Sequence, residues 1–284
     1  MTDPRFSRFA VADWSGAKGS KHKGIALAVC QSGNAAPTLV SPPDALWSRQ
    51  AVLDWVLSQD DNILIAFDFS FAPPFLLRGS YLPGENVPRL AKAFWAYVDD
   101  HCDDADLGAT SFLETQYRRH FYFGAADGPK SAFMHFRRCE AAWNDSGGGK
   151  ASTVYDAMGA AQVAKASFAG MRLLHHANRR IPVWPFDPLP AKGPAIVEIY
   201  TTIAARASGV RKGRSKIRDA MSLDTALTSF HSDSHTGLVA YSDHATDAIL
   251  TAAWLRRAAQ VQQLWTPPSL VDVSHTEGWT FGVA

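Results

Sequence analysis

Three aspartates stand where carboxylates could gather around metal ions. Asp13 ends the apolar run at 9–12, and Asp68 ends the apolar run at 63–67. Asp247 lies near the start of a predicted C-terminal helix. Carboxylates at the C-terminal ends of neighbouring strands point into the crevice where α/β sheets bind ligands. Because oxygen ligands favour Mg²⁺ or Mn²⁺, the pattern predicts a metal site that polarises a phosphodiester and activates water.

The predicted helix offers two more candidates beside Asp247. Asp243 and Asp247 are four residues apart and His244 and Asp247 are three apart, so all three can face the same way. An acid among apolar neighbours is costly without a partner, which favours Asp247 as a metal ligand. Asp243 either assists as a ligand or caps the helix. His244 would assist as a ligand or in proton transfer.

Glu198 interrupts a second apolar, strand-like segment at 196–200. If that face is buried, the carboxylate needs a metal or a base. If the face is exposed to water, Glu198 has no special role. We therefore count Glu198 as a candidate metal ligand with both interpretations open.

Basic residues gather in two zones that could contact phosphates. The first holds six cations within 206–218 and includes the candidate nucleic-acid-binding residues Arg211, Lys212, Arg214 and Lys216. A charge run of this kind is usually a solvated surface, but its place beside the Glu198 segment favours phosphate binding. The second zone, at 117–138, interleaves four arginines with aromatic residues. Such a pattern can stack bases, although most such aromatics belong to a core.

Composition narrows the class of protein. The 284 residues are 46% hydrophobic and 19% charged, with a formal net charge of +1. This is typical of a globular chain with a sizeable core, and any nucleic-acid surface must be a local patch. The three cysteines form no CxxC pair, which argues against zinc and a disulfide framework. The N-terminus lacks a signal-peptide pattern and no run could span a membrane, so we expect a cytoplasmic protein.

Hydrophobic periodicity predicts an α/β fold. The expected strands cover 7–14, 24–30, 38–40, 63–68, 181–186, 194–200 and 279–281. The expected helices cover 48–58, 89–101, 153–178, 201–208 and 245–263. The proline-rich and aromatic segment at about 70–180 is expected to be a helical or irregular insertion or cap on a single domain, 1–284.

These elements resemble the ribonuclease H-like superfamily. The helix start at 244–248, His-Ala-Thr-Asp-Ala, resembles the His-x-x-Asp-Ala motif of Holliday-junction resolvases, and the Asp-Trp-Ser-Gly turn at 13–16 resembles their first-strand turn. More closely, the chain is similar to an uncharacterised family of predicted ribonuclease H-like nucleases. The similar segments lie at 12–16, 67–68, 159–163, 170–171, 183–187, 197–200 and 242–248. Thr201 departs from that family, where proline often follows the Glu-x-Tyr motif.

The resemblance implies a mixed five-stranded sheet flanked by helices and a nuclease or phosphodiesterase that uses Mg²⁺ or Mn²⁺. Asp13, Asp68, Asp247 and His244 would be its catalytic residues. Two alternatives stay open. One is a non-catalytic protein on the same fold that binds nucleic acid or a nucleotide. The other is an actin-like phosphotransferase, which would need a duplicated domain and glycine-rich phosphate loops.

Overall fold

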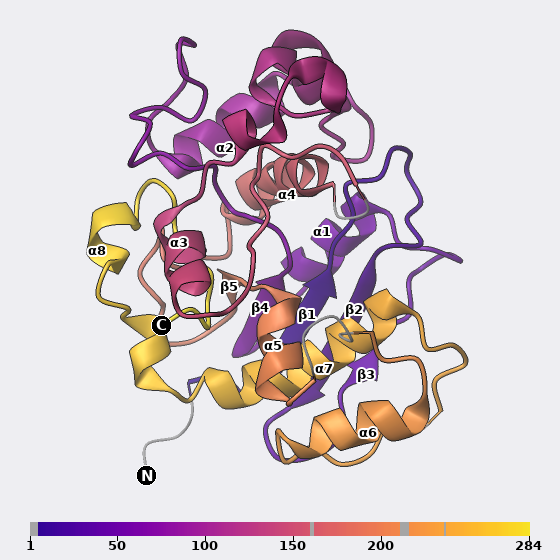
Figure 1. Cartoon of the computed structure of the whole chain (residues 1–284). Coiled ribbons are helices and arrows are strands. Elements are labelled where there is room, and N and C mark those ends of the chain that lie inside the picture. The colour runs from indigo at the N-terminus through magenta and orange to yellow at the C-terminus, as the bar shows by residue number, and fades with distance from the viewer. Residues whose placement is uncertain (1–4, 160–161, 211–215, 236) are drawn as a thin grey trace.

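The computed structural model describes residues 5–159, 162–210, 216–235 and 237–284. They form an α/β fold in which helices flank one mixed five-stranded sheet (Figure 1). The strands are β1 (Arg8–Asp13), β2 (Ala26–Gln31), β3 (Thr38–Leu39), β4 (Ile63–Phe67) and β5 (Ala195–Glu198). The helices are α1 (Arg49–Leu57), α2 (Ala91–Asp100), α3 (Arg138–Asp145), α4 (Val163–Ala177), α5 (Thr201–Ala207), α6 (Ala220–Thr228), α7 (Asp243–Ala258) and α8 (Leu270–Val273).

The sheet has the strand order β3-β2-β1-β4-β5. Strand β1 pairs antiparallel with β2 and parallel with β4, and β4 pairs parallel with β5. The strands β1, β4 and β5 therefore all end at the same edge of the sheet. Along that edge, Ala12 pairs with Phe67 and Phe67 pairs with Glu198. The residues that follow these pairs are brought side by side.

The two central strands are apolar over 9–12 of β1 and throughout β4 because both faces of the sheet are covered. Side chains alternate between the faces. Ala10 and Ile65 belong to one buried cluster, which also contains residues of α1, α2 and α4. Val11 and Leu64 belong to the other, which contains residues of α5, α6 and α7. Figure 1 shows these two groups of helices on opposite sides of the strands.

Several elements differ from the sequence prediction. The segment 181–186 is not a strand: Val183 makes only an isolated bridge to Ile196, and the chain then turns, with the Asp187 carboxylate accepting a hydrogen bond from the Val183 amide. The segment 279–281 likewise makes only one bridge, between Thr280 and Glu198. The predicted helix at 153–178 shortens to α4, and the C-terminal helix ends at Ala258 rather than 263.

The segment predicted as an insertion or cap, at about 70–180, packs on the sheet. It contains α2, α3 and α4, with short 3-10 and π-helical turns between α2 and α3. Its aromatic residues Phe94, Phe112 and Phe121 are fully buried. They join the same cluster as Ile65 and Phe67 of β4. The segment thus supplies much of the layer on that face of the sheet, whereas α3 packs against the cluster on the other face.

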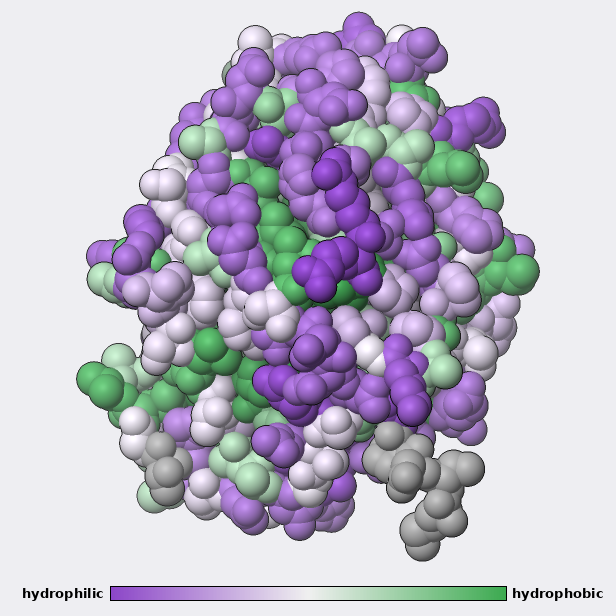
Figure 2. All heavy atoms as spheres, turned by 180° about the vertical axis from the view of Figure 1, so that it is seen from behind, coloured by the Kyte–Doolittle hydropathy of each residue, from purple (hydrophilic) through white to green (hydrophobic). Residues whose placement is uncertain are grey.

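Within the described residues, no helix is long and apolar enough to cross a membrane. The face behind the view of Figure 1 is mainly hydrophilic, with apolar residues visible in recesses between polar ones (Figure 2).

The described residues form one five-stranded sheet, and not the duplicated pair of domains that an actin-like phosphotransferase requires.

Candidate functional site

Asp13 and Asp68 become neighbours through strand pairing. Asp13 ends β1, and Asp68 follows directly after β4. Because Ala12 pairs with Phe67, the two aspartates occupy adjacent positions at the edge of the sheet. The Asp68 amide donates a hydrogen bond to the Ala12 carbonyl at 3.1 Å, which continues the pairing past the strand end. Alternation places both carboxylates on the face covered by α7.

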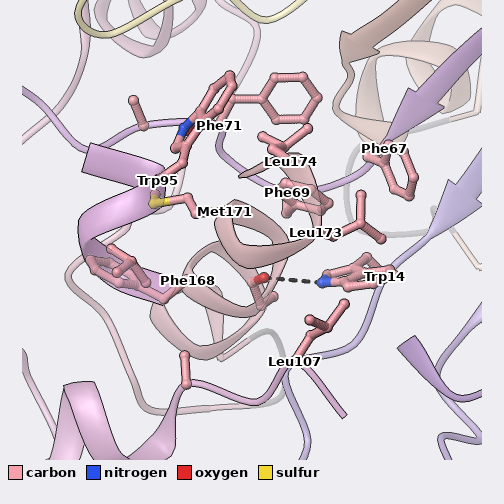
Figure 3. Packing of buried hydrophobic residues seen from close by; sticks show 14 of the residues in the cluster. Trp14, Phe67, Phe69, Phe71, Trp95, Leu107, Phe168, Met171, Leu173 and Leu174 are labelled. Atoms are coloured by element: carbon pink, nitrogen blue, oxygen red, sulfur yellow. Dashed lines mark hydrogen bonds between the residues drawn. The ribbon is translucent and has the colours of Figure 1, made fainter. Parts of the chain in front are cut away.

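The turn after Asp13 is anchored from the opposite face. Figure 3 shows Trp14 inserted among buried side chains, with Phe67 and Phe69 nearby. Its indole Nε1 donates a hydrogen bond to the Ala166 carbonyl of α4 at 3.1 Å. Gly16 lies so close to α4 that a β-carbon at this position would come within 2.2 Å of the Ala166 amide nitrogen. These contacts fix the direction in which Asp13 leaves the strand.

Helix α7 brings His244 and Asp247 to the two aspartates. The Ser242 side chain caps the helix by accepting a hydrogen bond from the Ala245 amide, so the cap is Ser242 and not Asp243. The helix then packs across β1 and β2. His244 Nδ1 lies 2.9 Å from Asp13 Oδ2. The edge of the sheet and the first turn of α7 therefore meet at one place.

The four residues line a cavity of about 530 Å³. One wall is formed by the turn after β1, and another by α3 and the residues that follow it. The lining also includes the first turn of α4, the residues that follow β4 and β5, Lys216, and residues near the C-terminus. Polar side chains lie among these walls, namely Ser15, Ser70, Ser152, Gln162, Ser167 and Tyr200.

The electrostatics of the cavity are those of crowded carboxylates. Burial, followed by the negative charge of Asp13, raises the pKa of Asp68 to about 8. The same two causes raise the pKa of Asp247 to about 7. Burial also raises the pKa of Asp13, although the hydrogen bond from His244 opposes the rise. That hydrogen bond in turn raises the pKa of His244. A bound cation would relieve the repulsion among these carboxylates.

Thr201 is a site residue whose role the sequence did not reveal. Its hydroxyl donates a hydrogen bond to Asp68 Oδ2 at 2.9 Å, and its amide donates a longer one to Asp68 Oδ1 at 3.4 Å. Proline, which often stands here in the family that the sequence resembles, could make neither bond because it lacks an amide hydrogen and a hydroxyl. Thr201 therefore orients the Asp68 carboxylate.

Two of the predicted ligands have other partners. Both Glu198 oxygens are taken: Oε2 accepts from Arg137 Nη1 at 2.8 Å and from the Phe71 amide at 2.7 Å, and Oε1 accepts from Arg137 Nη2 and the Thr280 hydroxyl. Asp243 forms ion pairs with Lys216 and, at 2.8 Å, with Arg218. These contacts give Glu198 a structural role. The Asp243 carboxylate is paired with two cations of the chain, Lys216 and Arg218.

The predicted nucleic-acid contacts are only partly described. Arg211, Lys212 and Arg214 lie outside the described residues, and Lys216 lines the cavity in its ion pair with Asp243. In the second basic zone each arginine has an acidic partner. The pairs are Arg118–Asp127, Arg119–Glu85, Arg137–Glu198 and Arg138–Asp272. Two of its aromatic residues, Tyr117 and Phe121, belong to the core.

Another group of metal-ligand type lies elsewhere on the chain. Ligand atoms of Asp99, His175 and His176 all fall within 4.8 Å of one another. It is the only such group of three or more among the described residues. The carboxylate oxygens of Asp13, Asp68 and Asp247 therefore do not all lie within 4.8 Å of one another. Asp99 already accepts a hydrogen bond from Arg172 at 2.7 Å, besides its 3.1 Å contact with His176. These residues are outside the lining of the cavity.

The donors in the cavity nevertheless fit a hard divalent cation. Asp13, Asp68 and Asp247 offer only carboxylate oxygens, which Mg²⁺ and Mn²⁺ prefer. Besides burial, the negative charge of Asp13 raises the pKa of both Asp68 and Asp247, and a bound cation would remove that repulsion. All three line the same cavity, Asp13 and Asp68 from strand ends and Asp247 from the start of α7.

The chain was compared with protein-family models, curated proteins and solved structures, and none of them matches it.

Proposed function

We propose that this chain is a divalent-metal-dependent hydrolase of phosphodiesters, a nuclease or phosphodiesterase built on a ribonuclease H-like fold. The observation on which the proposal rests is the meeting of Asp13, Asp68 and Asp247 in one cavity, although they come from two strand ends and a helix. The strand order and the antiparallel β1–β2 pair support the fold assignment.

Asp13, Asp68 and Asp247 would hold Mg²⁺ or Mn²⁺. When bound, such an ion supplies Lewis-acid polarisation of a phosphoryl oxygen and lowers the pKa of a water molecule. Thr201 and the Trp14 anchor keep two of the carboxylates in place before the ion arrives. Preorganisation of this kind avoids a cost at the moment of reaction.

His244 is placed to move a proton. Its Nδ1 is engaged by Asp13, which leaves Nε2 for exchange with substrate or solvent. In the hydrolysis, a water oxygen forms a bond to phosphorus while one ester P–O bond breaks. The leaving oxygen takes up a proton, and the products are a phosphomonoester and an alcohol. A histidine in reach of that oxygen can supply the proton.

The test is phosphodiester hydrolysis with Mg²⁺, Mn²⁺ or chelator present. We expect turnover only with the metal, and loss of turnover in Asp13→Asn. Asp44→Asn is the matched control, because it makes the same chemical change at an exposed ion pair with Lys21. Full activity of Asp13→Asn, or equal activity in chelator, would show that the reaction does not use this site. Metal binding without turnover of any phosphodiester would favour the non-catalytic alternative.

A further inference from the structure

The dimensions of the cavity bear on the size of its substrate. Its volume of about 530 Å³ is lined by segments far apart in the sequence. Sites of about 300–1,000 Å³ are typical of pockets that surround a small molecule. Interfaces with nucleic acid instead bury about 1,000–2,500 Å² of protein surface and are strongly positive.

The charge of the lining argues against a polyanion. Among its described residues are six carboxylates, namely Asp13, Asp68, Glu140, Glu198, Asp243 and Asp247. The described lysines and arginines in the lining are Arg137 and Lys216, and each is paired with an acid. A substrate that brings several phosphates would be repelled by such a lining, whereas one phosphate can be balanced by the bound metal.

Several arginines that could attract a phosphate backbone already have partners within the chain. The four arginines of the 117–138 zone are held by acids at 2.5–3.8 Å. Arg206 lies over the Trp143 ring, 5.2 Å from its centroid, and donates to the Gly147 carbonyl. These cations therefore stabilise the protein itself and are not free to follow a phosphate backbone.

We propose that the substrate is a phosphodiester of nucleotide size, which the cavity encloses, and not a polynucleotide. This inference rests on the proposed function. The acidic end of the cavity takes the single phosphate with its metal. The hydroxyl and amide groups of Ser70, Ser152, Ser167 and Gln162 suit the uncharged polar remainder of the molecule, such as a sugar or a base.

The experiment compares small and large phosphodiesters with the full-length chain and Mn²⁺. The small probes are bis(p-nitrophenyl) phosphate, a cyclic nucleotide and a dinucleotide. The large probes are closed circular duplex DNA, circular single-stranded DNA and a linear RNA. We expect hydrolysis of at least one small probe and at least 100-fold slower cleavage per bond of each large probe, roughly 2.7 kcal/mol in the barrier.

Cleavage of a polynucleotide as fast as the small probes would overturn this inference and leave the proposed function standing. Hydrolysis of no probe by a protein that binds Mn²⁺ would overturn both. The two failures are therefore distinguishable from one set of assays.

A variant of the cavity wall tests the enclosure itself. Ser152 is exposed and lines the cavity, so Ser152→Trp adds bulk there without disturbing the core. We expect KM for the small probe to rise about tenfold, which is ~1.4 kcal/mol, with the melting temperature unchanged. Ser131→Trp, at an exposed serine outside the lining, is the control and should leave KM unchanged. Equal KM values for the two variants would contradict the enclosed binding mode.

Discussion

His244 Nδ1 and Asp13 Oδ2 lie 2.9 Å apart although 231 residues separate them in the chain. The contact joins β1 to α7, the helix that packs across β1 and β2. It also couples two titratable groups, since the hydrogen bond raises the pKa of His244 and opposes the burial-driven rise in the pKa of Asp13. The site is thus assembled by the fold and not by any local motif.

Replacing Asp13 by Asn should leave the metal-free protein at least as stable as the wild type. Asn keeps the size of the side chain but removes one of the charges that raise the pKa values of Asp68 and Asp247. We expect an equal or higher melting temperature without metal, and no stabilisation by Mn²⁺. Thermal unfolding with and without Mn²⁺ measures both, and a marked loss of metal-free stability would show that Asp13 is mainly structural.

The raised pKa values of Asp68 and Asp247 predict that the stability of the metal-free protein, and its affinity for metal, both depend on pH. In the folded, metal-free protein Asp68 has a pKa of about 8 and Asp247 of about 7, whereas an unfolded Asp has a pKa of about 3.9. The folded state then binds more protons between these values. The contribution of these groups to metal-free stability is therefore full below about pH 4 and is lost as pH rises to about 8.

A cation must displace those protons. We expect Mn²⁺ to bind more tightly at about pH 8.5 than at about pH 6.5, with more protons released at the lower pH. Calorimetry in two buffers of different ionisation enthalpy counts the protons. Affinity that does not change with pH would mean that these carboxyl groups are not the ligands.

Thr201→Val tests how Asp68 is oriented. Valine keeps the shape of threonine but cannot donate the 2.9 Å hydrogen bond to Asp68 Oδ2. Hydrogen bonds to charged groups contribute about 1.5–3 kcal/mol, so Mn²⁺ affinity should fall roughly tenfold or more. The adjacent Thr202→Val serves as control, and a titration of both variants decides. Equal affinities would remove Thr201 from the site.

The buried ion pair of Arg137 and Glu198 should matter for stability. Their side chains are 1% and 3% exposed. Arg137→Met leaves the Glu198 charge without its partner, which should cost about 3–5 kcal/mol in the free energy of unfolding. The neighbouring Arg138→Met should cost less than about 1 kcal/mol, because its pair with Asp272 is half exposed. Urea unfolding measures both, and similar losses would contradict a structural role for the buried pair.

How far the sequence predicts the structure depends on the range of the interactions. The strands at Asp13 and Asp68 were predictable because apolar runs that end in an acid are local patterns. The role of Glu198 was not. Its partner Arg137 lies 61 residues away, and a strand pattern does not reveal which charge meets a buried carboxylate.

The segments at 181–186 and 117–138 were predicted less well, because their sequence patterns fit more than one structure. The apolar segment at 181–186 has the composition of a strand, but the turn held by Asp187 interrupts it. Much of the aromatic segment at 117–138 serves the core, which pattern alone cannot distinguish from a base-stacking surface. The sequence shows Thr201 only as a departure from a family motif, whereas the structure shows its two hydrogen bonds to Asp68.

The most direct test of the account is a crystal structure of the chain soaked with Mn²⁺, with the ion located by its anomalous scattering. We predict a peak in the cavity with oxygens of Asp13, Asp68 and Asp247 within about 2.0–2.6 Å. The Asp99–His175–His176 group serves as an internal comparison in the same crystal. A peak at that group with none among the three aspartates, or no peak at either place, would contradict the metal site on which the proposed function depends.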